Sequence, residues 1–294
     1  MSMILRPRRS VLYMPGSNAR ALEKGRSLDA DVLIFDLEDA VTPDAKETAR
    51  FQVLNALSEG GYGHRELIVR VNAIDTPCGQ KDIASLSRSG AHGLLLPKVD
   101  GAVTVQEVDA LMVASKAPND MAIWTMMETP LGILHSEEIA FSCTRMGGFV
   151  LGTSDLAKNL HCAHTRDRLP INTTLGLCIL AARAAGIAIV DGVHLDLSDD
   201  EGFEYSCRQG LEMGFDGKTL IHPKTIEMAN SVYSPSEDEL KWSRTIIAAH
   251  GQAKKEGIGV IVIEGKVVED LDVQNAMRLV AMADAIATIE TKNA

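Results

Sequence analysis

The chain has 294 residues, of which 46% are hydrophobic and only 4% are aromatic. This composition supports a large core that is built mainly from aliphatic side chains. The net charge of −11 excludes a general nucleic-acid-binding surface. It does not exclude an anionic small molecule, because a few Arg residues and a metal ion can reverse the charge locally.

Cysteine usage and the N-terminal segment indicate the cellular compartment. The five cysteines are widely spaced and form no CxxC pair, which is typical of reduced thiols. The first segment, MSMILRPRRS, lacks the apolar core of a secretory signal, and no apolar run in the sequence is long enough to span a bilayer. We therefore expect a cytoplasmic protein with no nucleic-acid or membrane partner.

Short runs rich in Val, Ile and Leu recur along the chain. They lie at residues 10–16, 31–40, 66–72, 93–99, 121–128, 148–156, 186–193 and 214–223. They lack strict alternation, as strands of a parallel sheet do when both faces are buried. Helix-like segments lie between them, at 19–29, 43–57, 104–116 and 173–186. This order predicts a (β/α)8 barrel, with a doubly wound open sheet as the alternative.

We assign residues 1–230 to the barrel and residues 231–294 to a C-terminal extension. The extension contains a hairpin-like segment at 259–269 and an amphipathic helix at 271–289. Apolar residues recur along this helix at near-helical spacing: Leu271, Val273, Met277, Val280, Met282 and Ile286. They predict an apolar face that packs either on its own barrel or across a subunit boundary.

Charged and polar side chains follow most of the predicted strands. They are Asp36, Glu38, Asp39, Arg70, Asn72, Lys98, Glu128, Asp155, Asp191, Lys218 and His222. A barrel places its chemistry at the carboxyl ends of its strands, so we expect these residues to share one rim. Each also has a structural interpretation, such as an ion pair or a helix cap, and His222 is better suited to ordering a loop than to catalysis.

Two of these carboxylates, Glu128 and Asp155, follow neighbouring strands and are suited to share a divalent cation. Oxygen ligands favour Mg²⁺, and no zinc-like Cys/His spacing is present. Arg70 is suited to bind a substrate carboxylate through two parallel hydrogen bonds. The segment Gly152-Thr153-Ser154 precedes Asp155 and is expected to offer free N–H groups to a carboxylate or an oxyanion.

Several motifs occur in an order that is typical of one enzyme superfamily. They are RSVLYMPGSN, FDLEDAV, VRVN, LLPKV, METPLGI, GTSDLAKNL, DGVHLDLSDDEGF and GFDGKTLIHP. Together they resemble the citrate lyase β-subunit-like (HpcH/HpaI aldolase) superfamily, which includes malyl-CoA and citramalyl-CoA lyases. The resemblance covers about residues 10 to 290. It implies a (β/α)8 barrel with a C-terminal extension, assembled into a homotrimer or homohexamer.

The resemblance also implies roles for individual residues. Glu128 and Asp155 would hold Mg²⁺, with Mn²⁺ as a substitute, and Arg70 would bind the carboxylate or carbonyl of the substrate. The residues that match the family's CoA-phosphate region are Arg9, Arg20 and Lys24. Lyases of the family often carry G-K-M-I-D in the extension, where the Asp acts as acid/base in a neighbouring subunit's site. Here the segment reads GKVVE, so Glu269 takes that position.

This departure leaves the reaction open. Asp270 and Asp272 follow Glu269 and are alternative acid/bases, and one additional methylene moves a carboxylate by about an ångström. The leading interpretation is a Mg²⁺-dependent lyase that cleaves malyl-CoA or citramalyl-CoA into acetyl-CoA, or a relative of it, and a 2-oxo acid. The alternatives are a malyl-CoA thioesterase that uses the same site, and a β-subunit that is active only within a larger complex.

Overall fold

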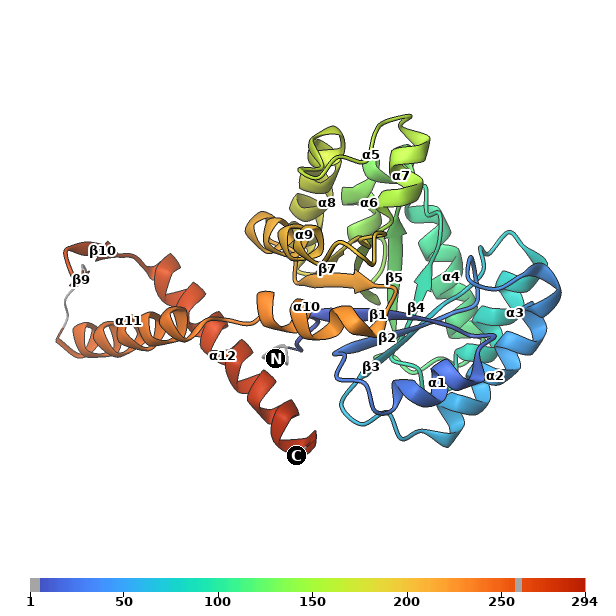
Figure 1. The fold of residues 1–294 in the computed structure, drawn as a ribbon, viewed down its shortest axis with the longest axis horizontal. Helices are drawn as coiled ribbons and strands as arrows, with labels where there is room; N and C mark the ends of the chain where they lie inside the picture. The colour runs from blue at the N-terminus through green and yellow to red at the C-terminus, as the bar shows by residue number, and fades with distance from the viewer. Residues whose placement is uncertain (1–5, 257–260, 294) are drawn as a thin grey trace. The chain divides into compact units, whose positions relative to one another are not determined.

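The computed structural model describes residues 6–256 and 261–293 (Figure 1). The chain divides into two compact units, Arg8–Tyr233 on one side of the division and Ser234–Ala294 with Met1–Pro7 on the other. The first unit contains the barrel and the second contains the C-terminal extension. We describe each unit by itself.

The first unit is built on eight parallel strands that close into a barrel. The strands are β1 (Ser10–Pro15), β2 (Val32–Asp36), β3 (Glu66–Arg70), β4 (Gly93–Leu96), β5 (Ala122–Met127), β6 (Met146–Leu151), β7 (Ala188–Asp191) and β8 (Gly217–Leu220). Each strand pairs with the next in sequence, and β8 returns to pair with β1. The predicted (β/α)8 barrel is thus confirmed, and the open sheet is excluded.

Helices connect the strands and surround the barrel (Figure 1). They are α1 (Ala19–Gly25), η1 (Pro43–Ala45), α2 (Lys46–Glu59), α3 (Pro77–Leu86), α4 (Ala102–Ala114), α5 (Pro130–Leu134), α6 (Ser136–Ala140), α7 (Thr153–Asn159), η2 (Leu169–Ile171), α8 (Asn172–Ala185), α9 (Asp200–Met213), η3 (Pro223–Thr225) and α10 (Ile226–Val232). The four helices that the sequence predicts are all present, within a few residues of their expected bounds. His222 accepts the N–H of Lys224 at the start of η3, as a loop-ordering residue does.

The core of the barrel unit has two layers. The larger layer fills the space between strands and helices. The smaller one fills the barrel and consists of Val11, Val32, Ile34, Ile68, Leu95, Trp124, Met126, Val150 and Val190, with Tyr13, Ala122 and Ala188 beside them. Successive side chains of a strand point to opposite faces, so a residue two positions beyond an interior one also points inward. This alternation directs Asp36, Arg70 and Glu128 into the mouth of the barrel.

The second unit consists of two helices and a hairpin. They are α11 (Glu237–Glu256), β9 (Ile261–Ile263), β10 (Lys266–Val268) and α12 (Asp270–Asn293). Glu264 and Gly265 both have positive φ, as a two-residue hairpin turn requires. The predicted hairpin and final helix are therefore confirmed, except that residues 259–260 of the hairpin segment lie outside the described residues.

The apolar face predicted for α12 is wrong in part. Val273 and Ala276 are buried in the small core of the second unit, whereas Leu271 is 72% exposed and Met277 is 50% exposed. Leu271 lies about 200° around the helix from Val273, because each residue turns an α-helix by about 100°. The two residues therefore cannot share one packed face.

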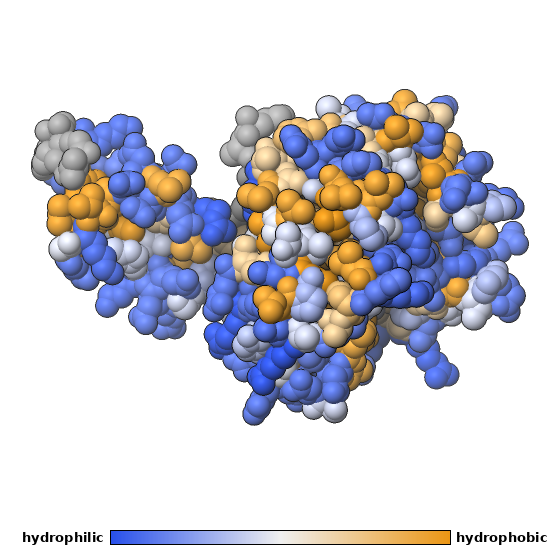
Figure 2. All heavy atoms as spheres, turned by 90° about the horizontal axis from the view of Figure 1, so that it is seen from above, coloured by the Kyte–Doolittle hydropathy of each residue, from blue (hydrophilic) through white to orange (hydrophobic). Residues whose placement is uncertain are grey.

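Several large apolar side chains remain exposed on the barrel unit. They include Leu131 and Leu134 on α5, Phe141 after α6, and Leu177 and Leu180 on α8. These helices lie at the top of Figure 1, and the view from above shows hydrophobic patches there (Figure 2). No helix in the described part of the chain is long and apolar enough to cross a membrane.

Candidate active site

A cavity of about 390 Å³ lies at the carboxyl ends of the barrel strands. Its lining includes residues from β1, β2, β3, β5 and the start of α7: Tyr13, Asp36, Arg70, Glu128, Gly152, Thr153, Ser154 and Asp155. The structure therefore brings together the predicted cation-binding and carboxylate-binding residues. Tyr13 is an addition that our sequence reasoning missed, although its position two residues after the interior Val11 could have revealed it.

Arg70 is buried, and two of its five N–H donors are paired with Asp36. Its Nε and Nη2 donate to the two carboxylate oxygens of Asp36 at 2.7 and 2.6 Å, and its guanidinium lies 4.9 Å from the ring centroid of Tyr13. Asp36 thus occupies the Nε/Nη2 edge, and the predicted pair of hydrogen bonds to a substrate carboxylate is left to the Nη1/Nη2 end of the guanidinium. Nη1 remains, at 3.3 Å from Glu38 and 3.6 Å from Asp39. A substrate can approach this guanidinium only end-on.

Asp36 is fixed by the loop that follows its own strand. Its Oδ1 accepts the N–H of Glu38 at 2.8 Å, and its Oδ2 accepts the N–H of Ala40 at 3.1 Å. With the two bonds from Arg70, this buried carboxylate is fully paired. Asp36 is thus neither solvated nor a cap for the next helix, and its role is to hold Arg70 in place.

Glu128 is 2% exposed and lies at the base of the cavity. Its Oε1 accepts the N–H of Lys98 at 2.8 Å. Burial raises the pKa of Glu128 to about 7; the bond from Lys98 opposes this shift, and the negative charge of Asp155 adds to it. Asp155 is half-buried in the first turn of α7. The two acids therefore repel each other, and a cation between them would favour their ionised forms.

The donor set fits Mg²⁺ better than a metal that requires a complete protein cage. Within residues 6–256 and 261–293, no three His, Cys, Asp or Glu side chains group closely enough to hold a metal ion. Mg²⁺ usually takes one or two carboxylates and completes its shell with water and substrate oxygens. Glu128 and Asp155 can provide such a pair.

The charges around the mouth of the barrel also favour a bound cation. The carboxylates there are Asp36, Glu38, Asp39, Glu128 and Asp155, whereas the cationic groups are Arg70 and Lys98. An anionic substrate would meet a net negative field at this mouth. An additional positive charge is needed before a carboxylate can bind there.

The N–H groups at the start of α7 are less numerous than expected. The N–H of Gly152 donates to the carbonyl of Met127 at 3.1 Å, so it is not available to a ligand. The N–H groups of Thr153 and Ser154 belong to the first helical turn, where no intrahelical acceptor exists. Both residues line the cavity.

Asp191 and Lys218 do not belong to this rim, contrary to the sequence-based expectation. They are paired across β7 and β8 at 2.8 Å, and both are almost fully buried. Their side chains point outward, because a methyl group added to Gly210 of α9 would lie 2.9 Å from Asp191. Arg168, from the segment before α8, also binds Asp191, at 2.6 and 2.8 Å. The cluster therefore links strands to helices.

Of the residues matched to CoA phosphates, the structure does not support Arg9. Arg9 precedes β1 at the opposite end of the barrel, and both its N–H and its guanidinium bind the buried Asp31. Arg20 and Lys24 are exposed on α1, which begins just after the carboxyl end of β1. Both remain candidates, and Arg20, in the first turn of α1, is nearer than Lys24 to the end of the barrel that carries the cavity.

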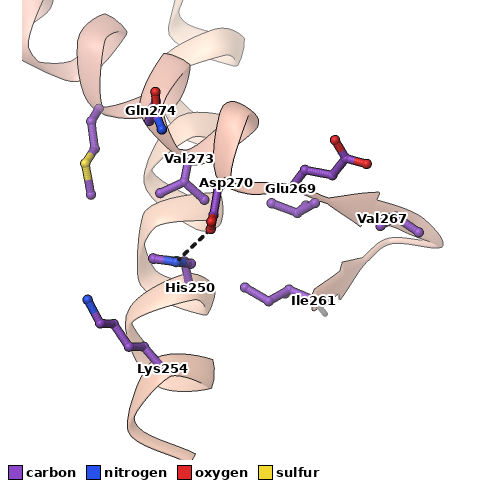
Figure 3. Close-up of a pocket in the computed structure, with 10 residues that line it drawn as sticks. His250, Lys254, Ile261, Val267, Glu269, Asp270, Val273 and Gln274 are labelled. Carbon is purple, nitrogen blue, oxygen red and sulfur yellow. Dashed lines mark ion pairs between the residues drawn. The ribbon is translucent and has the colours of Figure 1, made fainter. Parts of the chain in front are cut away.

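Two of the candidate acid/bases of the extension, Glu269 and Asp270, line a cavity of about 710 Å³ within the second unit (Figure 3). Asp270 is 3.6 Å from His250, and Asp272 accepts the N–H of Glu269 at 2.9 Å, which caps α12. Glu269 is exposed, and its carboxylate points away from His250 and Asp270 in Figure 3. All three acids are exposed, but Asp270 and Asp272 each have a partner for their carboxylate, whereas the carboxylate of Glu269 points away from this cluster.

Comparison with known proteins identifies the family. The model of the HpcH/HpaI aldolase/citrate lyase family matches residues 9–223. The chain belongs to this family. The match spans the whole barrel, from the residue before β1 to the start of η3.

Two groups of relatives within the HpcH/HpaI aldolase/citrate lyase family carry different names. A (3S)-malyl-CoA thioesterase of Cereibacter sphaeroides is 48% identical over 281 residues, which cover 96% of each chain. A citrate lyase subunit beta of Leuconostoc mesenteroides is 35% identical over 292 residues, which cover 98% of this chain and 97% of the relative. Both alignments extend through the C-terminal extension.

Solved structures support the same family assignment. CitE from Mycobacterium tuberculosis, in complex with magnesium, acetoacetate and coenzyme A, superposes with a TM-score of 0.76 at 27% identity. The comparison covers 95% of this chain and all of that one. A structure of citrate lyase beta subunit from the same organism is complexed with oxaloacetate and magnesium, at a TM-score of 0.65 and 27% identity, covering 78% of this chain and 98% of that one. Magnesium and 2-oxo or 3-oxo acids are thus ligands of family members.

We expect Gly152→Ala to displace Glu128 at the mouth of the barrel and so to lower the rate of turnover. The added methyl group would lie 2.5 Å from Glu128 Oε2, so Glu128 must shift. A shift of about 1 Å at a reacting group can cost about 10²-fold in rate. Steady-state turnover and urea unfolding check this expectation. Gly176→Ala on α8 is the matched control, since nothing lies within 4 Å of its added methyl group, and it should leave turnover unchanged.

The raised pKa of Glu128 predicts a pH-dependent stability of the metal-free protein. The folded-state pKa of about 7 lies above the ordinary value of 4.5, so the folded state holds this proton more tightly. The stabilisation is complete below pH 4.5 and is lost as the pH rises through 7; over that range it amounts to about 3 kcal/mol. Urea unfolding in EDTA at pH 5 and pH 8 measures it. Glu128→Gln should reduce the difference, and an equal pH dependence in both proteins would contradict the assignment.

Proposed function

We propose that this protein hydrolyses the thioester of a 3-carboxy-3-hydroxyacyl-CoA such as malyl-CoA, in a Mg²⁺-dependent reaction. The observation that carries the proposal is 48% identity, over 96% of each chain, to a relative named (3S)-malyl-CoA thioesterase. The mouth of the barrel supports it, because Arg70 Nη1 can meet a carboxylate and the Glu128–Asp155 pair suits a cation beside a hydroxyl group.

The lyase predicted from the motifs is the second candidate. It would cleave the C–C bond of malyl-CoA or citramalyl-CoA to give acetyl-CoA, or a relative of it, and a 2-oxo acid. The citrate lyase beta subunits among the relatives favour it, as do CitE structures that hold pyruvate or oxaloacetate with magnesium. Both reactions need the same recognition of a carboxylate next to a hydroxyl or keto oxygen.

In this proposal the barrel residues bind and orient the substrate. Arg70 donates end-on from Nη1 to the substrate carboxylate, while Asp36 holds the other edge of the guanidinium. The N–H groups of Thr153 and Ser154 bind a second substrate oxygen. Glu128 and Asp155 hold Mg²⁺, for which Mn²⁺ can substitute, and the bound ion supplies Lewis-acid polarisation of a substrate oxygen.

The proton transfer is assigned to the extension. Glu269, from a neighbouring copy of the chain, takes a proton from the attacking water, and the hydroxide adds to the thioester carbonyl carbon. The C–S bond then breaks, and the CoA thiolate leaves and takes up the proton, which gives malate and CoA. In the lyase reaction the same carboxylate would move the proton to or from the enolate carbon. Arg20 and Lys24 bind the CoA phosphates.

We further propose a homotrimer or homohexamer. Exposed apolar side chains on α5 and α8, and Leu271 and Met277 of the extension, support burial against other copies. The partners in this proposal are a CoA thioester and the acid products, with no nucleic acid and no membrane.

Product analysis tests the proposed reaction. Purified protein is incubated with malyl-CoA or citramalyl-CoA, with Mg²⁺ or with EDTA. Malate or citramalate, glyoxylate or pyruvate, acetyl-CoA and free CoA are quantified. The free hydroxy acid (malate or citramalate) and CoA without a 2-oxo acid support the thioesterase, whereas glyoxylate or pyruvate with acetyl-CoA supports the lyase. No turnover of either thioester would contradict both reactions and favour a β-subunit that acts only in a complex. Activity that persists in EDTA would contradict the metal.

Asp155→Asn should weaken Mg²⁺ binding at least tenfold, because one anionic ligand becomes neutral; loss of an outer-shell partner alone costs about 10- to 100-fold. Asp155 is half-buried on a helix surface, so the fold should persist. Calorimetric titration with Mg²⁺ measures the affinity, and circular dichroism measures the fold. Asp39→Asn is the control, since Asp39 also lines the cavity and carries the same charge. Equal Mg²⁺ affinity in Asp155→Asn and wild type would remove Asp155 from the metal site.

A further inference from the structure

Lys98 has an unusual backbone that positions Glu128. It follows β4 with a φ of 51°, a left-handed conformation that non-glycine residues rarely adopt. This geometry directs its N–H at Glu128 Oε1, 2.8 Å away. The backbone of Lys98 therefore holds one carboxylate of the cavity, and its side chain takes no part in that bond.

The side chain of Lys98 holds a second carboxylate. Its Nζ donates to Glu38 Oε1 at 2.6 Å and lies 3.8 Å from Asp39. The other oxygen of Glu38, Oε2, accepts the N–H of Asp39 at 3.0 Å and lies 3.3 Å from Arg70 Nη1. The carboxylate of Glu38 thus lies between the ammonium of Lys98 and Nη1 of Arg70.

Only the side chain of Glu38 can move between the ammonium of Lys98 and the guanidinium of Arg70. Its backbone N–H donates to Asp36, and its carbonyl accepts from Lys46 Nζ at 2.6 Å, so its main chain is fixed at both ends. The bond to Lys98 is short and charge-assisted, whereas the contact with Arg70 is longer. Without the ammonium, the nearly buried Glu38 would gain most by turning fully toward Arg70 Nη1.

That rotation would occupy the end of the guanidinium that a substrate needs, because Asp36 already takes Nε and one N–H of Nη2. We infer that Lys98 is a positioning residue, whose ammonium draws Glu38 away from Arg70 and so keeps Arg70 Nη1 available to the carboxylate of the substrate. This inference deepens the proposed function and rests on carboxylate recognition by Arg70. Asp39 is the weaker competitor for Nη1, because its side chain is 56% exposed and 3.6 Å away.

A rescue experiment separates this role from a structural one. Lys98→Asn removes the ammonium but keeps the backbone N–H, and Asn tolerates positive φ better than most residues. We expect its KM for malyl-CoA to rise about tenfold, the size of one charge-assisted hydrogen bond, with little change in kcat. Lys98→Arg, which keeps the charge, should restore the wild-type KM. The double variant Lys98→Asn/Glu38→Gln should also restore it, because a neutral amide competes for Arg70 much more weakly than a carboxylate.

Binding of malate, measured by calorimetry in the presence of Mg²⁺, gives the same comparison without turnover. If the wild type does not turn over malyl-CoA but malate affinity falls in Lys98→Asn and recovers in the double variant, the proposed reaction fails and this inference stands. If the double variant binds malate as weakly as Lys98→Asn, Lys98 acts through its backbone and the inference is overturned. It is also overturned if Lys98→Asn binds malate as the wild type does.

Discussion

Glu269→Ala is expected to lower kcat for malyl-CoA by about 10²- to 10⁴-fold, the usual contribution of a general acid/base. Mg²⁺ affinity should stay nearly unchanged, because Glu128 and Asp155 lie in the barrel unit. The structural reason is the orientation of the carboxylates: that of Asp270 lies near His250 and that of Asp272 caps α12, whereas that of Glu269 points away from His250 and Asp270. Steady-state kinetics and calorimetric titration with Mg²⁺ measure the two quantities.

Two further variants sharpen this result. Asp272→Asn is the matched control, since it alters a helix cap beside Glu269 and should affect stability more than kcat. Glu269→Asp tests the choice of reaction: a rise in C–C cleavage with a fall in hydrolysis would mean that the longer Glu favours water. If Glu269→Ala leaves both reactions unchanged, Glu269 is a surface acid, and Asp270 becomes the next candidate.

Arg70→Met is expected to lower the free energy of unfolding by about 3–5 kcal/mol, because it leaves Asp36 charged, buried and without its cation. It should also abolish tight binding of malate, since Nη1 is lost. Urea unfolding and calorimetry measure these effects separately. The double variant Arg70→Met/Asp36→Asn should recover much of the stability, because the unpaired charge is gone, but it should not recover malate binding.

Two results would contradict this prediction, one from the double variant and one from Arg70→Met alone. If it regains malate affinity, the carboxylate of the substrate is bound by a group other than Arg70. If Arg70→Met is as stable as the wild type, Asp36 does not depend on this ion pair. Either result would also weaken the inference about Lys98, which depends on the remaining donor of Arg70.

The barrel was predictable because its strands are buried on both faces. Such strands need continuous apolar runs, and every run that we identified became a strand within a few residues of its expected bounds. The spacing between runs required helices, which fixed the order of elements. The extension was less predictable, because its two long helices and its hairpin bury few residues and α12 has no continuous apolar stripe.

The sequence predicted where the candidate site lies, but not the full set of residues that form it. The sequence placed Arg70, Glu128, Asp155 and the segment 152–154 at strand ends, and the structure brings them to one cavity. It also placed Asp191 and Lys218 there, which is wrong. The error arises because a position at the end of a strand does not specify which face of the strand carries the side chain.

The sequence by itself determined the fold, the end of the barrel that carries the polar residues, and the family. Only the tertiary structure decided that Asp36 takes one edge of Arg70 and leaves its Nη1 end, that Lys98 turns its N–H toward Glu128, and that Arg9 lies at the opposite end. The physical reason is that alternation along a strand reverses with a shift of one residue. A charged side chain also pairs with whichever partner the neighbouring strand brings within about 3 Å, and chain order does not contain that distance.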